Sequence, residues 1–350
     1  MKNLLVTGGC GFIGSNFIQQ IYEKEHNCYI INLDKLTYAG NQENLKGIPD
    51  SFHTLIKGDI CDYNLLESLF EKYQFDAVIH FAAESHVDRS IDGPAEFIQT
   101  NIVGTLNLLE VSRNYFQSSK QKDFRFLHVS TDEVYGSLAD FGKFQESTPY
   151  NPTSPYSASK AGSDHLVRSW NKTFGLPTII TNCSNNYGPY QFPEKLIPVM
   201  IINCLQHKSL PIYGNGMNVR DWLYVRDHCD AIQTVLKHGQ IGETYNIGGN
   251  NEITNFDVVL TICSILDEIC PRQDGSQYKE LINYVKDRPG HDFRYSIDSS
   301  KINQELNWLP KESFESGIRK TIEWYLNNRE WWLQIQGKSY MQERLGVLQS

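Results

Sequence analysis

The feature that most constrains the fold is a run of glycines directly behind a short apolar stretch near the start of the chain. Residues 4–6 are typical of a buried strand, and an amphipathic pattern typical of a helix covers 12–25. Between them lie Gly8, Gly11 and Gly14 in the spacing G-x-x-G-x-x-G. Gly8 permits a tight turn, Gly11 lets backbone N–H groups approach a phosphate, and Gly14 lets the helix pack close to the strand. The sequence therefore predicts a strand–turn–helix unit that holds the pyrophosphate of a dinucleotide.

The same alternation continues through the first half of the chain. Further strands are expected at 29–31, 77–81 and 125–129, and further helices at 64–72 and 103–118. Alternating strands and helices predict an α/β fold, a Rossmann-type doubly wound parallel sheet with helices on both faces. In such a fold, ligands bind beyond the carboxyl ends of the strands.

Beyond residue 180 the pattern loosens, because several prolines divide the chain into short pieces. We expect a smaller mixed α/β lobe there that binds the substrate, with 220–225 and the helical pattern after it returning to the first lobe. The aromatic-rich segment 324–332 is expected to pack on the second lobe as a helix. The predicted domains are a dinucleotide-binding Rossmann domain at 1–180 plus a return segment at about 219–248, and a substrate lobe at 181–218 and 249–350.

Composition argues against several classes of partner. A net charge of −9 disfavours nucleic acid and anionic membrane surfaces, since both need clustered Lys and Arg. The eight cysteines form no C-x-x-C pair, so neither a metal site nor a disulfide framework has the spacing that it needs. No apolar run reaches the roughly 18 residues of a membrane span, and the apolar start is too short for a signal peptide. A cytoplasmic protein is therefore expected.

Residues at the ends of the next strands favour NAD as the dinucleotide. Asp34 lies twenty residues after Gly14, where a carboxylate accepts hydrogen bonds from the adenosine ribose and repels the 2′-phosphate of NADP. Asp59 and Ile60 are candidates to contact adenine, and the segment Ala82-Ala83-Glu84-Ser85 to line the pyrophosphate and nicotinamide ribose. Ordinary strand-to-helix loops are the alternative for both segments. A phosphoryl-transfer loop is excluded, because the glycine run lacks the Gly-Lys-Ser/Thr that grips a terminal phosphate.

Tyr156 and Lys160 stand four residues apart at the start of a predicted helix, so their side chains share one face. A tyrosine that acts as a base near neutral pH needs about 4 kcal/mol of preferential stabilisation of its phenolate. One ammonium about 4 Å away in a partly buried site supplies on the order of 4 kcal/mol. The pair is therefore predicted to take a proton from a substrate hydroxyl that is being oxidised. A surface i,i+4 pair is the alternative when this spacing is taken alone.

Thr131-Asp132-Glu133 follows the strand predicted at 125–129 and places a hydroxyl and two carboxylates at the same edge of the sheet. Oxidation of an alcohol needs only a hydroxyl and a base. The added acid and base therefore indicate a second chemical event, such as an elimination. A helix N-cap role for Thr131 or Asp132 is the alternative.

Taken together, these motifs resemble the extended short-chain dehydrogenase/reductases of the NAD-dependent epimerase/dehydratase family and, among them, the dTDP-glucose 4,6-dehydratases. The matching segments run almost from end to end of the chain. They are the glycine run, 34–40, 80–88, 130–136, 156–160, 182–189 and 287–292. Thr131-Asp132-Glu133 is the specific signature, since epimerases of the same fold usually lack both acids at this place.

The resemblance implies a redox-neutral dehydration on one tightly held NAD that is regenerated in each turnover. Tyr156, with Lys160 and Thr131, would take the proton of the sugar 4-hydroxyl while hydride passes from C4 to NAD. Glu133 would then take the C5 proton, Asp132 would protonate the departing 6-hydroxyl, and the hydride would return to C6. The product would be a nucleotide 4-keto-6-deoxyglucose, the precursor of rhamnose and other deoxysugars. This chemistry needs Asp132 protonated and Glu133 ionised.

The resemblance also implies further binding residues and a homodimer paired through helices, one of them the helix of Tyr156. Cofactor contacts are implied for Phe12, Ile13, Lys35, Leu36, Thr37, Thr100 and Asn186, in addition to Tyr156 and Lys160. Substrate contacts are implied for Ser85, Thr131, Asn185, Lys195, Leu196, Pro211, Tyr213, Arg220, Asn255, Arg288, His291 and Tyr295. Arg220 and Arg288 are the expected diphosphate clamps, because guanidinium groups suit phosphate oxygens.

Other functions of the same fold also fit these residues. A UDP-glucose 4,6-dehydratase, or an epimerase or decarboxylase that acts on another nucleotide sugar, shares the Tyr156 and Lys160 pair. Asp132 and Glu133 favour dehydration among these, while thymine and uracil both remain possible as the base. A non-catalytic NAD-binding regulator is expected to lack the tyrosine or the lysine, and both are present.

Overall fold

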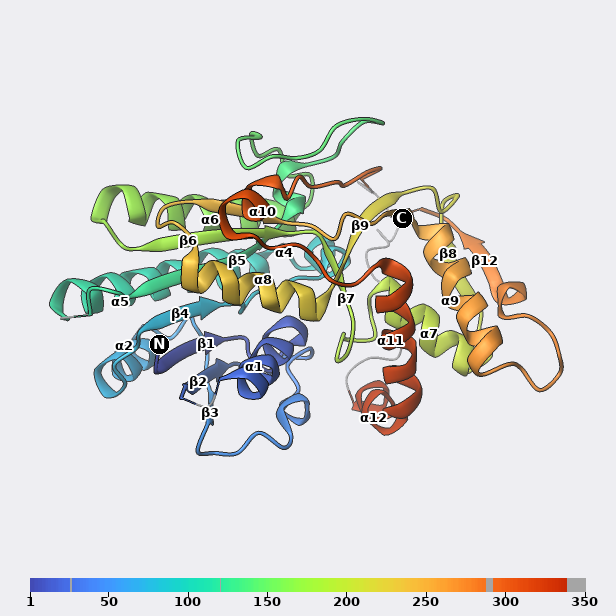
Figure 1. Ribbon diagram of the computed structural model, residues 1–350, viewed down its shortest axis with the longest axis horizontal. Coiled ribbons are helices and arrows are strands. Elements are labelled where there is room, and N and C mark those ends of the chain that lie inside the picture. The colour runs from blue at the N-terminus through green and yellow to red at the C-terminus, as the bar shows by residue number, and fades with distance from the viewer. Residues whose placement is uncertain (26, 120, 288–291, 339–350) are drawn as a thin grey trace.

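The computed structural model describes residues 1–350 except 26, 120, 288–291 and 339–350. Its centre is a parallel seven-stranded sheet in the order β10-β6-β5-β4-β1-β2-β3 (Figure 1). The strands are β1 (Asn3–Thr7), β2 (Tyr29–Asp34), β3 (His53–Lys57), β4 (Ala77–His80), β5 (Arg125–Thr131), β6 (Thr178–Cys183) and β10 (Thr244–Ile247). The strand order reverses at β1, which is where a doubly wound sheet places its ligand. The predicted Rossmann-type fold is confirmed.

Helices cover both faces of this sheet, because the strands are apolar on both sides. Leu4 and Val6 of β1 pack with α1 (Phe12–Lys24) and α8 (Val225–His238), whereas Leu5 packs on the other face. The helices on that other face are α2 (Tyr63–Lys72), α5 (Thr105–Ser118) and α6 (Pro155–Phe174). Short elements complete this part: η1 (Gln42–Leu45), α3 (Val87–Asp92), α4 (Pro94–Phe97), the π-helix η2 (Ile98–Gly104) and η3 (Asp132–Tyr135).

A smaller α/β part lies beside the carboxyl ends of the central strands (Figure 1). It contains a three-stranded sheet, β11-β9-β7, and a parallel pair, β12-β8. Tyr325 and Trp332 of the aromatic-rich segment are buried in its core, as predicted. Its elements are β7 (Asn185–Tyr187), α7 (Leu196–Leu205), β8 (Leu210–Tyr213), β9 (Val219–Tyr224), β11 (Glu252–Thr254), α9 (Asn255–Ile269), η4 (Tyr278–Leu281), β12 (Ile282–Val285), α11 (Phe314–Asn327) and α12 (Arg329–Lys338).

The chain passes more than once between the two parts. After β9 in the small sheet, α8 and β10 return to the central sheet, and α10 (Ser300–Leu306) contributes Ile302 to the core around α8. The domain division at 1–180, 219–248, 181–218 and 249–350 stays a prediction. Within the described part of the chain, no helix has the length and apolar character that a membrane crossing needs.

Candidate active site

A cavity of about 830 Å³ opens between the carboxyl ends of the central strands and the smaller part. Its volume lies in the range of ligand sites. It brings together every predicted site residue that the structure describes, except Leu36. Arg288 and His291, the other two predicted contacts that are not among its lining residues, lie outside the described residues.

The glycine run forms the floor of this cavity at β1 and α1. Gly8 has a φ of +71°, and a Cβ there would come within 2.7 Å of the Ala82 backbone nitrogen. A Cβ on Gly14 would come within 2.4 Å of the Gly8 carbonyl oxygen. Gly11 caps α1 without a side-chain hydrogen bond, so no side chain occupies the N–H groups at this helix end. These features fit an anionic group seated against the backbone.

Asp34 ends β2 at the cavity wall, and backbone amides hold its carboxylate. One oxygen accepts from the Cys10 N–H at 2.8 Å and the other from the Leu36 N–H at 2.8 Å. Burial raises the pKa of Asp34, and these two hydrogen bonds oppose the rise. Leu36 does not line the cavity: its φ is +56°, its side chain packs against the core, and its N–H orients Asp34. Lys35 forms an ion pair with Asp59 at 3.0 Å beside this point.

Asp132 is the most deeply buried acid of the predicted catalytic set. It is 1% exposed, and its Oδ2 has no hydrogen-bond partner among the described residues. Burial, followed by the charges of Glu133 and Asp221, raises the pKa of Asp132 well above its usual range. The raised pKa favours the protonated carboxyl, which is the form that the predicted elimination needs.

Thr131 links the acids to the tyrosine. Its hydroxyl accepts from the Glu133 N–H at 3.3 Å, which is the N-cap role considered above, and lies 3.4 Å from Asp132 Oδ1. It also forms a hydrogen bond with Tyr156 that lowers the pKa of the phenol. Burial and the charge of Glu133 dominate, so the net pKa of Tyr156 is raised.

Tyr156 and Lys160 lie on the first turns of α6, where Ser154 begins the helix with a capping box. Both line the cavity and both are buried. The Lys160 ammonium donates to the Val129 carbonyl at 3.0 Å and lies 3.5 Å from His128 Nε2. These contacts direct it toward β5, so its expected stabilisation of the Tyr156 phenolate stays a prediction.

The smaller part supplies the facing wall. Arg220 is 5% exposed, donates to the Asp292 carbonyl at 2.8 Å and stacks over Tyr295 at 4.4 Å. Lys195 reaches across the cavity to donate to the Ser85 carbonyl at 3.0 Å. The other predicted substrate contacts of this part also line the wall: Asn185, Leu196, Pro211, Tyr213 and Asn255.

Known proteins match this architecture and this cavity. Residues 5–321 match the family described as GDP-mannose 4,6 dehydratase. The chain belongs to this family. It is 56% identical over 354 residues to dTDP-glucose 4,6-dehydratase of Neisseria meningitidis serogroup B, with 99% of each chain covered. It is 57% identical over 350 residues to dTDP-glucose 4,6-dehydratase 1 of Escherichia coli K12, with 96% of each chain covered.

A solved structure of the same kind of enzyme is also similar to this chain. The crystal structure of dTDP-glucose 4,6-dehydratase from Bacillus anthracis in complex with NAD superposes with a TM-score of 0.86 at 46% identity. The match covers 96% of this chain and 100% of that chain. The family resemblance drawn from the sequence is confirmed.

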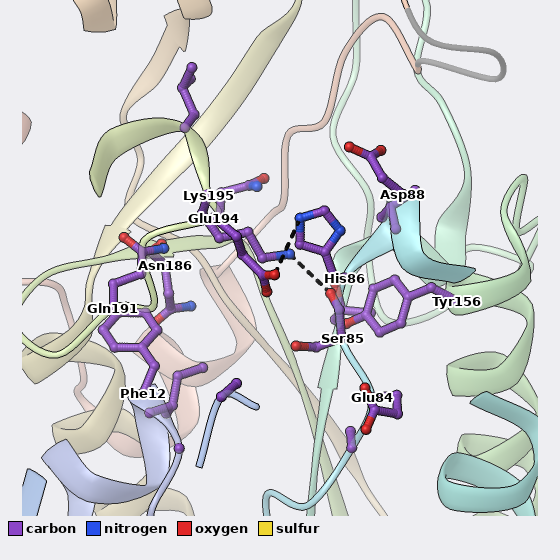
Figure 2. Close-up of a pocket in the computed structure, with 18 of the residues that line it drawn as sticks. Phe12, Glu84, Ser85, His86, Asp88, Tyr156, Asn186, Gln191, Glu194 and Lys195 are labelled. Atoms are coloured by element: carbon purple, nitrogen blue, oxygen red, sulfur yellow. Dashed lines mark hydrogen bonds and ion pairs between the residues drawn. The ribbon is translucent and has the colours of Figure 1, made fainter. Parts of the chain in front are cut away.

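One cavity residue of this GDP-mannose 4,6 dehydratase family member was missed from the sequence. Glu194 accepts from Tyr38 at 3.1 Å and from Arg89 at 3.2 Å, and lies 3.9 Å from His86 Nε2. Figure 2 shows Glu194 and Lys195 reaching toward His86 and Ser85. Glu194 thus ties the two parts of the molecule together beside the cavity. Its position next to the predicted Lys195 was the available signal.

Proposed function

We propose that this chain is a dTDP-glucose 4,6-dehydratase, which converts dTDP-glucose to dTDP-4-keto-6-deoxyglucose and water with a tightly bound NAD. The observation that carries the proposal is the buried Asp132 with a raised pKa, which lies next to Glu133 and is joined to Tyr156 through Thr131. An oxidoreductase or epimerase needs the tyrosine but has no use for this acid. The names of the relatives and the bound NAD of the solved structure support the same activity.

The residues around Gly8 and Asp34 fit NAD. A phosphate can approach the backbone where Gly8 and Gly14 leave no room for a Cβ. Asp34 faces the cavity with two oxygens oriented by backbone amides, which suits ribose hydroxyls and opposes a 2′-phosphate. Bound NAD supplies a hydride acceptor for oxidation at C4 and a hydride donor for reduction at C6.

Oxidation at C4 needs a base for the 4-hydroxyl proton, and Tyr156 is that base. The Thr131 hydrogen bond favours its phenolate against burial and the charge of Glu133, which raise the pKa of Tyr156, and the Lys160 ammonium is expected to favour the phenolate further. The resulting C4 ketone makes the C5 proton acidic. Thr131 and Tyr156 therefore determine the first step.

Elimination then uses the two acids. Glu133 removes the C5 proton, and Asp132 donates its proton to the departing 6-hydroxyl, which leaves as water. When C6 has been reduced, Glu133 returns its proton to C5. Glu133 is thereby restored, while Asp132 is left ionised and Tyr156 is left protonated.

The cycle closes only when one proton passes from Tyr156 to Asp132. The Thr131 hydroxyl forms a hydrogen bond with the phenol and lies 3.4 Å from Asp132 Oδ1. A hydroxyl can donate and accept at once, so Thr131 is placed to pass this proton without solvent.

Mass spectrometry of dTDP-glucose and UDP-glucose after incubation with the purified holoenzyme tests this function. Loss of one water from dTDP-glucose, without net formation of reduced cofactor, is the expected result. If UDP-glucose reacts faster than dTDP-glucose, the base of the preferred substrate is uracil and not thymine. Isomerisation of the sugar at unchanged mass would favour an epimerase. No reaction of either sugar would refute the proposal.

Three broader assignments accompany the proposal. The product suits rhamnose or other deoxysugar synthesis. The proposed compartment is the cytoplasm, where eight cysteines without a disulfide are stable as thiols. We also propose a homodimer that pairs through α6 and the adjacent α5, and a monomer mass by light scattering would refute it.

A further inference from the structure

Lys160 lies in an almost closed environment, and burial lowers the pKa of its ammonium group. Its side chain lies between α6 and the central sheet, the residue is 4% exposed, and its one short contact is the Val129 carbonyl at 3.0 Å. A carbonyl dipole alone does not balance a buried charge, which is stable only beside a counter-charge. The protein must therefore supply an anion near Lys160.

The titratable groups that face Lys160 come from three strands and from its own helix. They are His80 of β4, His128 of β5, Cys183 of β6, and Tyr156 and Asp164 of α6. Burial lowers the pKa of His80, and lowers that of His128 to about 4, while it raises the pKa of Cys183 and Tyr156. All four are uncharged at neutral pH, which leaves Asp164 as the anion of this group.

Asp164 is built to stay ionised. Its carboxylate is fully buried, and Oδ2 accepts from the Ser130 hydroxyl at 2.9 Å and from the Tyr150 hydroxyl at 2.8 Å. Burial raises the pKa of Asp164, but the His128 hydrogen bond and the Lys160 charge outweigh it, so the net pKa is lowered.

His128 lies between the anion and the cation. Its Nε2 is 3.2 Å from Asp164 Oδ1 and 3.5 Å from Lys160 Nζ. Nε2 also lies 3.2 Å from the Ser163 hydroxyl, and Nδ1 has no partner among the described residues. The imidazole therefore packs between Asp164 and Lys160.

We propose that Asp164 is the positioning residue that supplies the counter-charge of Lys160 and keeps it an ammonium beside the catalytic cavity. Asp164 follows Lys160 by four residues on α6, so the two share one face. It is absent from the cavity lining, so it acts on the reaction through Lys160. The inference rests on the proposed function for its consequence in catalysis, but the charge state of Lys160 can be read without turnover.

The test compares the wild-type holoenzyme with Asp164→Asn and Tyr150→Phe, each with ¹⁵N-labelled lysine side chains. The Lys160 signal is assigned by its loss in Lys160→Arg. Asp164→Asn is expected to weaken proton binding by Lys160 at least tenfold, so its NMR titration midpoint moves down by one pH unit or more. Tyr150→Phe removes a hydrogen bond to the same carboxylate but keeps its charge. The proton affinity of Lys160 in this variant is therefore expected to stay within threefold of the wild-type value.

The dehydration rate gives a second readout. Because the ammonium is the active form, the alkaline limb of the kcat profile moves to lower pH in Asp164→Asn, while the KM for dTDP-glucose is unchanged. An unchanged Lys160 midpoint in Asp164→Asn, or an equal shift in Tyr150→Phe, overturns the proposal.

A reciprocal measurement on Asp164 tests the proposal if the Asp164→Asn variant does not fold. If Asp164→Asn is unfolded, Lys160→Met is used, in which ¹³C NMR of the Asp164 carboxyl should show at least tenfold tighter proton binding. An unchanged Asp164 carboxyl overturns the proposal. A wild-type enzyme that fails to dehydrate dTDP-glucose would refute the proposed function and leave the lysine titration standing.

Discussion

Asp132 and Asp164 are two buried carboxyl groups whose pKa values shift in opposite directions. Both are essentially inaccessible to solvent. Burial and the charges of Glu133 and Asp221 raise the pKa of Asp132. Asp164 receives hydrogen bonds from Ser130 and Tyr150 and faces Lys160, so its pKa is lowered. Burial raises the pKa of both carboxyl groups, and the charges and hydrogen-bond donors around each group determine whether its net pKa is raised or lowered.

The alternation of β5 separates the two regions. His128 and Ser130 point to the face that carries α6, where they meet Asp164. Thr131 ends the strand at the cavity, and the η3 turn then carries Asp132. Asp132, whose pKa is raised, and Asp164, whose pKa is lowered, thus lie on either side of the end of β5.

Loss of the neutral acid and its neighbour should have the largest effect on activity. The double variant Asp132→Asn/Glu133→Gln is expected to lower the dehydration rate about 10⁴-fold, because both proton transfers of the elimination are removed. Oxidation at C4 should survive, so reduced nicotinamide accumulates and is seen by its absorbance. Equal loss of oxidation and dehydration would contradict the separation of the two steps.

Tyr156 belongs to both regions, since it shares α6 with Asp164 and a hydrogen bond with Thr131. Tyr156→Phe is expected to lower the rate about 10³-fold, because the proton acceptor of the oxidation is lost. Unlike the double variant, it should form no reduced nicotinamide with dTDP-glucose. Thr131→Val, which keeps the phenol, serves as the control and should retain more of the oxidation.

The sequence predicted the catalytic residues around Asp132 and missed the contacts around Asp164. Thr131, Asp132, Tyr156 and Lys160 stand in short motifs whose spacing alone places them on a strand end or one helix face. Asp164 is defined by contacts with Ser130 and Tyr150, which come from other segments and from no motif. Its i+4 spacing from Lys160 was visible, but an acid four residues from a lysine is also typical of an exposed helix.

The same limit applies at the cavity wall. The fold followed from local alternation, since the strands β1, β2, β4 and β5 are apolar enough to be recognised alone, whereas the half-buried edge strand β3 was not among the strands predicted by residue range. Glu194 needed knowledge of where Tyr38 and Arg89 lie, more than 100 residues earlier in the chain. The family resemblance implied a cofactor contact for Leu36, but its φ is positive and its side chain packs against the core instead of lining the cavity.

Stability measurements sharpen the contrast between the two acids, and Asp164→Asn should have the larger effect. Removing the ionised partner of a buried ammonium is expected to lower the free energy of unfolding by about 3 kcal/mol at pH 7. The lowered pKa of Asp164 means that its contribution is present above the unfolded-state pKa and is lost as pH falls through the folded one. The gap between variant and wild type, measured by urea unfolding, should therefore narrow below about pH 4. A gap that does not depend on pH would mean that Asp164 acts by packing and not by charge.

Asp132→Asn should change stability by a smaller amount and in the opposite direction. The raised pKa of Asp132 means that the wild-type carboxyl favours the folded state fully only below its unfolded-state pKa, and this contribution is lost as pH rises toward the folded pKa. An asparagine has no proton to lose, so the variant is expected to gain about 1 kcal/mol over wild type at pH 8. The two proteins should be equally stable below about pH 3, where the wild-type carboxyl is protonated in both states. A variant that is less stable than wild type at pH 8 would show that Asp132 is held ionised, and the general acid of the elimination would then have to be sought elsewhere.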